Sequence, residues 1–189
     1  MNTTSIMIVG VGGQGTLLAS KLLGNVLIAQ GYDVKLSEVH GMSQRGGSVV
    51  TYVKYGDVVY SPIVDQGEAD YILSFEILES ARWISYLREG GVLLTNTQKT
   101  WPMPVITGAM AYPEGIVEKL SAMADVQAVD ALKLAEQAGS PKAVNVVLIG
   151  VLSRRMDIPE EAWLKAIEET VPPKFLELNK KAFRLGREA

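Results

Sequence analysis

The stretch Gly10-Val11-Gly12-Gly13-Gln14-Gly15 decides how the fold is interpreted. A hydrophobic run at residues 5–9 leads into it, and an apolar helical pattern begins directly after it at Thr16. Its three spaced glycines fit the G-x-G-x-x-G turn of dinucleotide-binding folds, in which the glycines permit a tight turn, an approach of the backbone to a diphosphate and close helix–strand packing. The N–H groups of residues 13–16 would then face an anion. Spacing alone leaves a second possibility open, in which the glycines serve packing only.

The segment after this turn extends the dinucleotide interpretation. A largely buried helix is predicted over residues 16–30 and ends at Gly31, and a second strand is predicted over residues 33–38. Glu38 stands at the carboxyl end of that strand, where dinucleotide folds place an acid against a ribose hydroxyl. A solvated surface position is the alternative. The predicted cofactor-binding residues are therefore Gly10, Gly12, Gly13, Gln14, Gly15, Thr16 and Glu38.

A polar, glycine-rich connection at residues 40–47 contains the only histidine of the chain. His40, Gln44 and Arg45 are its candidate catalytic residues. A guanidinium offers a rigid fork of donors that suits a phosphate or a carboxylate, and flanking glycines let the backbone come close to a ligand. The alternatives are a simple surface loop, or an Arg45 that pairs with Glu38 or Glu76 to brace the edge of the sheet.

The rest of the chain alternates strands and helices. A turn at Gly56-Asp57 predicts an antiparallel excursion over residues 48–60. Further strands are predicted at 69–75, 92–96, near 105 and at 126–129, with helices at 76–88, from 112 to 124 and at 131–137. This alternation predicts an α/β, Rossmann-like fold with a mostly parallel sheet and helices on both faces.

The C-terminal part is expected to be entirely helical. Residues 143–155 form an apolar run that leaves some ambiguity between helix and strand. Asp157 and Glu160 suggest an acidic capping box with Pro159 in the first turn of a helix that reaches Val171, and a last helix is expected to end at Gly186. We expect a single domain over residues 1–189, with an α/β core at 1–140 and a helical tail at 141–189.

Composition narrows the class of protein. The 189 residues carry a net charge of −3 without a basic stripe, which argues against nucleic acid and membrane surfaces as partners. The sequence has no cysteine, so it cannot supply a disulfide framework, a thiol nucleophile or cysteine ligands for zinc or iron–sulfur centres. No metal site is expected. The N-terminal segment lacks a basic signal region and no apolar run has transmembrane length, so a cytoplasmic location is expected.

The sequence also lacks a catalytic constellation of its own. There is no G-x-S-x-G elbow, no H-E-x-x-H and no Walker lysine after the glycine turn. A glycine turn without such groups favours a binding or assembly subunit whose partner carries the reactive cofactor. A free-standing oxidoreductase that binds NAD or a flavin at the glycine turn is the other class.

Three segments carry a family resemblance: residues 10–15, residues 37–48 (Ser-Glu-Val-His-Gly-Met-Ser-Gln-Arg-Gly-Gly-Ser) and residues 60–63 (Tyr-Ser-Pro-Ile). In order and spacing they resemble the gamma domain of the 2-oxoacid:ferredoxin oxidoreductases. Residues 145–150 and the closing Asn179, Ala182, Phe183 and Gly186 extend the likeness along the chain. The form Ser43-Gln44-Arg45 is similar to the indolepyruvate branch rather than the pyruvate branch.

The resemblance implies an oxidative decarboxylation in which an aryl 2-oxoacid and coenzyme A give an acyl-CoA, carbon dioxide and reduced ferredoxin. It also implies that thiamine diphosphate and the iron–sulfur clusters belong to a larger partner subunit, while coenzyme A is the cosubstrate and ferredoxin the electron acceptor. This chain would be inactive alone. A gamma subunit for another 2-oxoacid, such as pyruvate or 2-oxoglutarate, is the alternative within the family.

Overall fold

A mixed six-stranded sheet forms the centre of the computed structural model, which describes residues 3–38 and 46–189. The strand order is β2-β3-β1-β4-β5-β6. The strands are β1 (Thr3–Val11), β2 (Asp33–Glu38), β3 (Ser48–Gly56), β4 (Ala69–Ser74), β5 (Leu87–Asn96) and β6 (Asp125–Val129). β1, β4, β5 and β6 are parallel neighbours, so their carboxyl ends meet at one edge of the sheet, called the carboxyl edge below.

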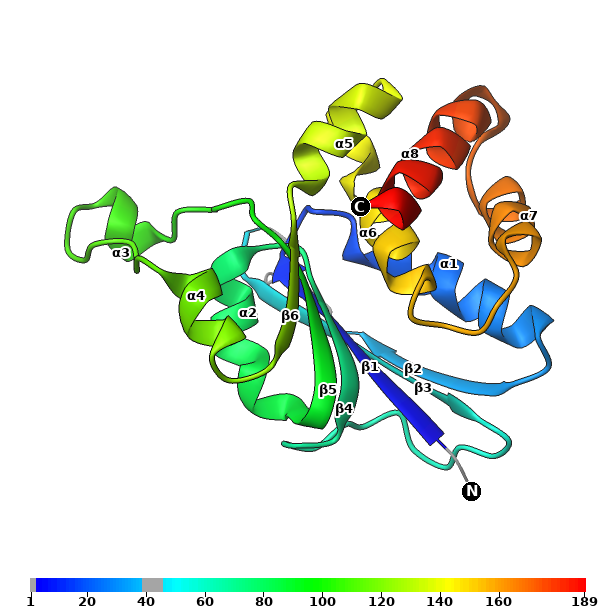
Figure 1. Ribbon diagram of the computed structural model, residues 1–189, viewed down its shortest axis with the longest axis horizontal. Helices are drawn as coiled ribbons and strands as arrows, with labels where there is room; N and C mark the ends of the chain where they lie inside the picture. Colours follow the sequence, from blue (N-terminus) through cyan, green and yellow to red (C-terminus); the bar gives the residue numbers. More distant parts are fainter. Residues whose placement is uncertain (1–2, 39–45) are drawn as a thin grey trace.

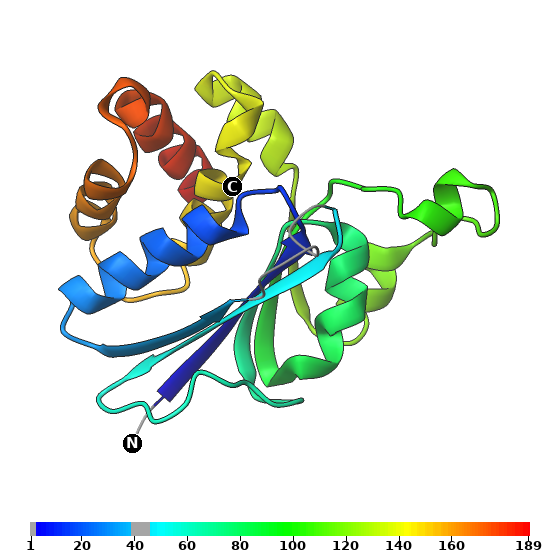
Figure 2. The same cartoon turned by 180° about the vertical axis from the view of Figure 1, so that it is seen from behind.

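Helices cover both faces of this sheet (Figures 1 and 2). They are α1 (Thr16–Ala29), α2 (Ile77–Trp83), α3 (Met103–Ile106), α4 (Ile116–Ser121), α5 (Ala131–Ala138), α6 (Val144–Ser153), α7 (Glu160–Thr170) and α8 (Leu176–Glu188). Alternate side chains of β1 serve the two layers: Ile6 and Ile8 pack with α1 and the C-terminal helices, whereas Met7 and Val9 pack with α2 and α4. The predicted α/β fold with helices on both faces is confirmed.

β3 runs antiparallel between β1 and β2, with Val11 opposite Ser48 and Glu38 opposite Thr51. The predicted antiparallel excursion is therefore present. The prediction of a hairpin at Gly56-Asp57 is wrong, because residues 58–60 form no strand. The N–H of Val59 instead donates to a carboxylate oxygen of Asp33 at 2.8 Å. This bond folds the segment over the start of β2.

Two further elements differ from the prediction. The expected strand near Val105 is the short helix α3, in which the carbonyl of Pro102 accepts from the N–H groups of Val105 and Ile106 at 2.9 and 3.1 Å. The helix expected over residues 76–88 ends at Trp83, and a 3-10 turn at 84–86 follows. Leu87 already belongs to β5, where it pairs with Ala69 of β4.

The C-terminal segment is helical throughout, and every residue of α6 is buried. A helix satisfies its own backbone hydrogen bonds, so the apolar run can be surrounded by core on all sides. α8 packs closely along α6, where Gly186 faces Gly150. The helix therefore does not end at Gly186, as the sequence suggested, but continues to Glu188.

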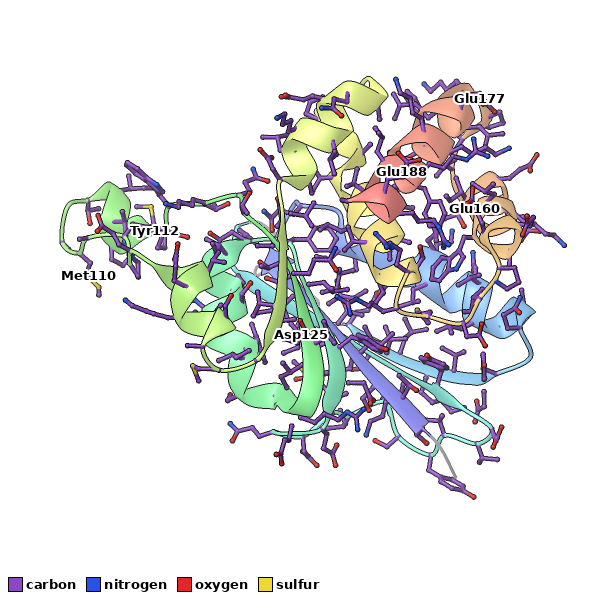
Figure 3. All side chains as sticks on the ribbon, in the orientation of Figure 1. Met110, Tyr112, Asp125, Glu160, Glu177 and Glu188 are labelled. Atoms are coloured by element: carbon purple, nitrogen blue, oxygen red, sulfur yellow. The ribbon has the colours of Figure 1, made fainter. Side chains whose placement is uncertain are left out.

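The capping box predicted for α7 is also wrong. Pro159 is the N-cap, and no side chain caps the first turn. Glu160 instead accepts a hydrogen bond from Nε of Arg184 at 3.0 Å and so links α7 to α8 (Figure 3). The acidic side chain at the start of α7 serves a contact between helices.

α1 is less buried than predicted, because Leu17 and Ile28 are 45% and 60% exposed. Gly24, in the middle of α1, faces the side chain of Leu36 in β2 rather than backbone.

Within the described part of the chain, no helix has the length and hydrophobicity that are needed to cross a bilayer.

Candidate functional site

The glycine turn closes the carboxyl end of β1 and begins α1. Gly13 and Gly15 have φ angles of 99° and 86°, which favour glycine, and Gly15 is the N-cap of α1. The amide of Gln14 holds the turn together: its Oε1 accepts from the N–H of Val11 at 2.8 Å, and its Nε2 donates to the carbonyl of Phe75 at 3.4 Å. Gln14 is therefore a bracing residue between β1 and the end of β4.

Packing explains two of the glycines. A Cβ at Gly10 would lie 2.9 Å from Cβ of Phe75, and a Cβ at Gly15 would lie 2.8 Å from Nδ2 of Asn145 in α6. Gly12 has a different contact, because its N–H donates to the carbonyl of Gly47 at 2.8 Å. The predicted strand–turn–helix is present, and the binding of a phosphate or a dinucleotide by Gly10, Gly12, Gly13, Gln14, Gly15 and Thr16 stays a prediction.

Glu38 lies at the end of β2 and accepts a hydrogen bond from Oγ of Ser20 in α1 at 2.6 Å. Because β3 separates β2 from β1, Glu38 is one strand spacing, about 4.8 Å, farther from the glycine turn than a direct neighbour of β1 would be. The structure thus gives Glu38 a partner within the chain. Its role toward a ribose stays a prediction.

The candidates His40, Gln44 and Arg45 lie outside the described residues. The two ends of their connection are described, however, and both are at the carboxyl edge. Glu38 ends β2 there, and Gly47 is bonded to Gly12 of the glycine turn. The connection between β2 and β3 therefore starts and finishes at the carboxyl edge, and its second end lies beside the glycine turn.

Two hollows flank the glycine turn. One, of about 200 Å³, lies between the turn and β3 and is lined by Gly12, Thr16 and Thr51 among others. The other, of about 460 Å³, is more polar and includes Gln98, Lys142 and Asn145. Its volume is within the range of small-molecule sites. The sequence reasoning missed Gln98 and Lys142, because each stands in a segment without a motif and joins the turn only through the fold.

Glu76 follows the end of β4, and its buried carboxylate accepts hydrogen bonds from four donors in the described part of the chain. Its Oε2 caps α2 by accepting from the N–H groups of Leu78 and Glu79 at 2.7 and 2.9 Å. Its Oε1 accepts from the N–H of Thr100 at 2.9 Å and from the hydroxyl of Tyr112 at 2.8 Å. Burial is the largest cause, and the hydrogen bond to Glu76 the next, of a pKa of the Tyr112 hydroxyl far above its ordinary value. Tyr112 therefore stays protonated and donates a hydrogen bond to Glu76.

One turn further along α2, Glu79 is 5% exposed, and its side chain has three partners among residues 3–38 and 46–189. It pairs with Arg82 at 3.1 Å, and its Oε2 accepts from Nε1 of Trp83 at 3.3 Å and from the hydroxyl of Ser48. Ser48 begins β3 directly after the connection that holds the catalytic candidates. α2 thus ties that connection to the same edge of the sheet.

The donors at this edge suit an anionic or polar ligand rather than a metal ion. Backbone N–H groups, the amides of Gln98 and Asn145 and the ammonium of Lys142 surround the larger hollow. Over residues 3–38 and 46–189, no group of three or more histidine, cysteine, aspartate or glutamate side chains is close enough to hold a metal ion. Both hollows lie at the carboxyl edge, where open α/β sheets usually bind ligands.

Comparison with known proteins agrees with the sequence motifs. The family model for pyruvate ferredoxin/flavodoxin oxidoreductases matches residues 5–189. The chain is 45% identical to the indolepyruvate oxidoreductase subunit IorB of Thermococcus kodakarensis, over all of this chain and 96% of that protein. It is 38% identical to the subunit of the same name from Archaeoglobus fulgidus, over 96% of this chain and 92% of that one.

A solved structure has the same fold. It is the pyruvate oxidoreductase subunit PORC of Thermotoga maritima, with a TM-score of 0.76, 25% identity and coverage of 100% of this chain and 97% of that one. The resemblance drawn from the glycine turn and residues 37–48 is therefore confirmed. The chain belongs to the pyruvate ferredoxin/flavodoxin oxidoreductase family.

Proposed function

We propose that this chain is the smaller subunit of an indolepyruvate:ferredoxin oxidoreductase, which oxidatively decarboxylates aryl 2-oxoacids to acyl-CoA. The observation that carries the proposal is the 45% identity to an indolepyruvate oxidoreductase subunit along the whole chain. The substrate is assigned by this likeness, since relatives named for pyruvate are only 24–27% identical.

The proposed division of labour places the chemistry of thiamine diphosphate and the iron–sulfur clusters on a larger partner subunit. The donor set of this chain supports that division, because it has no cysteine thiolate to hold such a cluster. Thiamine diphosphate supplies the carbanion chemistry when it is bound. Coenzyme A is the cosubstrate and ferredoxin the electron acceptor of the complex, which we place in the cytoplasm.

In this proposal the carboxyl edge faces the partner's active centre. The glycine turn and the connection with His40, Gln44 and Arg45 leave the sheet side by side, since Gly47 bonds directly to Gly12. Backbone N–H groups of the turn and the guanidinium of Arg45 are donors for an anionic group of the 2-oxoacid or of coenzyme A. The chain would bind and orient these groups while the partner carries out the bond changes.

The purified chain alone should show no indolepyruvate-dependent reduction of ferredoxin or of a viologen dye, because it lacks the groups for decarboxylation and electron transfer. Adding the larger subunit from the same organism should give turnover, measured by dye absorbance with coenzyme A present. Turnover by the lone chain would defeat the division of labour. Turnover of the complex with pyruvate but not with indolepyruvate would defeat the substrate assignment.

Replacing Arg45 with methionine tests the site. We expect the complex to lose roughly tenfold or more in kcat/KM for coenzyme A or the 2-oxoacid, because a charge-assisted hydrogen bond contributes about 1.5–3 kcal/mol. Melting temperature and subunit association should stay near wild type. The matched control is Arg88→Met, which removes a guanidinium that pairs with Asp70, near the start of β4 and away from the carboxyl edge. Normal kinetics in an unstable Arg45→Met complex would identify Arg45 as a structural brace.

A further inference from the structure

A projecting segment of the chain, residues 100–112, contributes no residue to the two hollows beside the glycine turn. It leaves the carboxyl end of β5, contains α3 and extends away from the sheet in both views (Figures 1 and 2). We call it the β5–α4 arm. Its large apolar side chains are exposed: Trp101 by 59%, Met103 by 66%, Ile106 by 60% and Met110 by 65%.

The arm also contains no charged residue. Between Lys99 and Glu114 there is no charged residue, although 21% of the whole chain is charged. An exposed apolar segment of this kind, without charged residues to keep it hydrated, is typical of an interaction surface. Because the arm has no charge, its complement is an apolar surface and not an acidic or basic one.

The arm is folded in the isolated chain. Within it, the N–H of Thr107 donates to the carbonyl of Met103 at 2.9 Å, and the N–H of Met110 donates to the carbonyl of Pro104 at 3.0 Å. These bonds form a compact tip, and Met110 lies on it, farther out than Tyr112 (Figure 3). A segment that is already ordered loses less conformational entropy when it binds.

Glu76 fixes the base of the arm. A single carboxylate oxygen, Oε1, accepts from Thr100 at one end of the arm and from Tyr112 at the other. The ammonium of Lys99 lies 5.6 Å from the centre of the Tyr112 ring and adds a cation–π contact. The buried hydrogen-bond network therefore holds both ends of the arm together and sets the direction in which it projects.

The shape of the arm indicates the kind of surface to which it binds. A protrusion with a tryptophan, two methionines and an isoleucine needs an apolar groove large enough for several of these side chains. Two apolar-lined hollows on this chain measure about 200 and 180 Å³, below the roughly 300 Å³ at which ligand-binding pockets usually begin. A second copy of this chain therefore fits poorly at those hollows. The arm also starts from the carboxyl edge, which the partner subunit covers in the proposed function.

We infer that the β5–α4 arm docks into an apolar groove of the larger subunit, with Trp101 and Ile106 among its anchors and Glu76 as the residue that positions it. This inference rests on the proposed function, because it takes its partner from there. In the proposed function the same partner also covers the glycine turn and the hollow beside Gln98.

The test compares two double variants that each change two exposed apolar residues to serine. Trp101→Ser with Ile106→Ser changes the arm. Ile28→Ser with Met123→Ser is the matched control, because these side chains are 60% and 71% exposed and lie outside the arm. Each chain is titrated with the larger subunit from the same organism by calorimetry, and its melting temperature is measured alone.

We expect the arm variant to bind the larger subunit roughly tenfold or more weakly, since anchors of this kind dominate association. The control should bind like wild type, and both variants should melt like wild type. Equal binding by the arm variant, or equal weakening by both doubles, would overturn the role of the arm and leave the proposed function standing. If the wild-type chain does not bind the larger subunit, the proposed function itself fails. If the wild-type chain self-associates and the arm substitutions abolish this, the arm binds a second copy of the chain, which contradicts the inference.

Discussion

Replacing Gly186 with alanine should lower the melting temperature by roughly 10 °C. α6 and α8 cross so closely that a Cβ at Gly186 would lie 2.0 Å from the carbonyl oxygen of Val147, and a Cβ at Gly150 would lie 2.2 Å from that of Phe183. Both obstacles are backbone atoms, so no side-chain rotation relieves them. Overpacking commonly costs about 1–3 kcal/mol. We expect roughly 3 kcal/mol, at about 2–4 °C per kcal/mol for a chain of this size.

Gly24→Ala is the matched control for this substitution. Gly24 is also a buried glycine in a helix, but the nearest atom to its Cβ would be Cδ1 of Leu36, at 3.3 Å. That side chain can move, and alanine favours the helix by up to about 1 kcal/mol. Gly24→Ala should therefore melt within a few degrees of wild type or slightly above it. If Gly186→Ala melts like Gly24→Ala, the close crossing of α6 and α8 is wrong.

Replacing Glu76 with alanine should destabilise the chain by roughly 3–5 kcal/mol. The substitution leaves four donors without their acceptor: the N–H groups of Leu78, Glu79 and Thr100 and the hydroxyl of Tyr112. Hydrogen bonds to charged groups contribute about 1.5–3 kcal/mol each, but neighbouring losses are not additive and water can reach part of the gap. Denaturant unfolding followed by circular dichroism would measure the change.

The same substitution should loosen the β5–α4 arm, since Glu76 holds both of its ends. Thermolysin, which cleaves before apolar residues such as Ile106 and Met110, should then cut the variant within residues 101–111 faster than it cuts wild type. Glu89→Ala is the control, because Glu89 is exposed on β5, and an exposed substitution usually changes stability by less than about 0.5 kcal/mol. Equal stability and equal cleavage of the two variants would show that Glu76 has no such central role.

The sequence predicted the parts of the fold that follow from local periodicity. The apolar run before Gly10, the helix after Gly15 and the strands expected at 69–75 and 126–129 were placed within a few residues, because burial gives each a regular pattern. The place of β3 could not be predicted in this way. Its sequence fits an antiparallel strand, but the choice between pairing with residues 58–60 and inserting between β1 and β2 depends on long-range contacts.

Helix packing explains the other differences. Gly186 was interpreted as a helix end because glycine commonly stops helices, whereas here it permits a contact between helices that are distant in sequence. Glu160 was interpreted as part of a cap because of its position before an apolar run, yet it pairs with Arg184. In both cases the local interpretation was wrong, because the residue's partner is distant in sequence.

The candidate site also combines residues that a local motif reveals with residues that only the fold brings together. Gln14 and Gly15 were found because they belong to a motif, and Glu76 was named only as a possible partner of Arg45. Among the described residues, both oxygens of Glu76 accept from donors of α2, of Thr100 and of Tyr112, and its pairing with Arg45 stays a prediction. Lys142 and Gln98 reach the glycine turn from segments more than 80 residues away in the chain. No motif links such positions before the fold is known.

The insertion of β3 between β1 and β2 has a consequence for how members of this family can diverge. Because β3 is antiparallel, the connection that precedes it leaves and re-enters the sheet on the same side, and neither strand depends on its length for register. Doubling the length of a flexible loop costs only about 0.6 kcal/mol of closure entropy. Residues can therefore be inserted, deleted or exchanged between Glu38 and Gly46 while the six strands stay in place. Under the proposed function, in which this connection contacts the substrate, substrate preference can change there without a new scaffold.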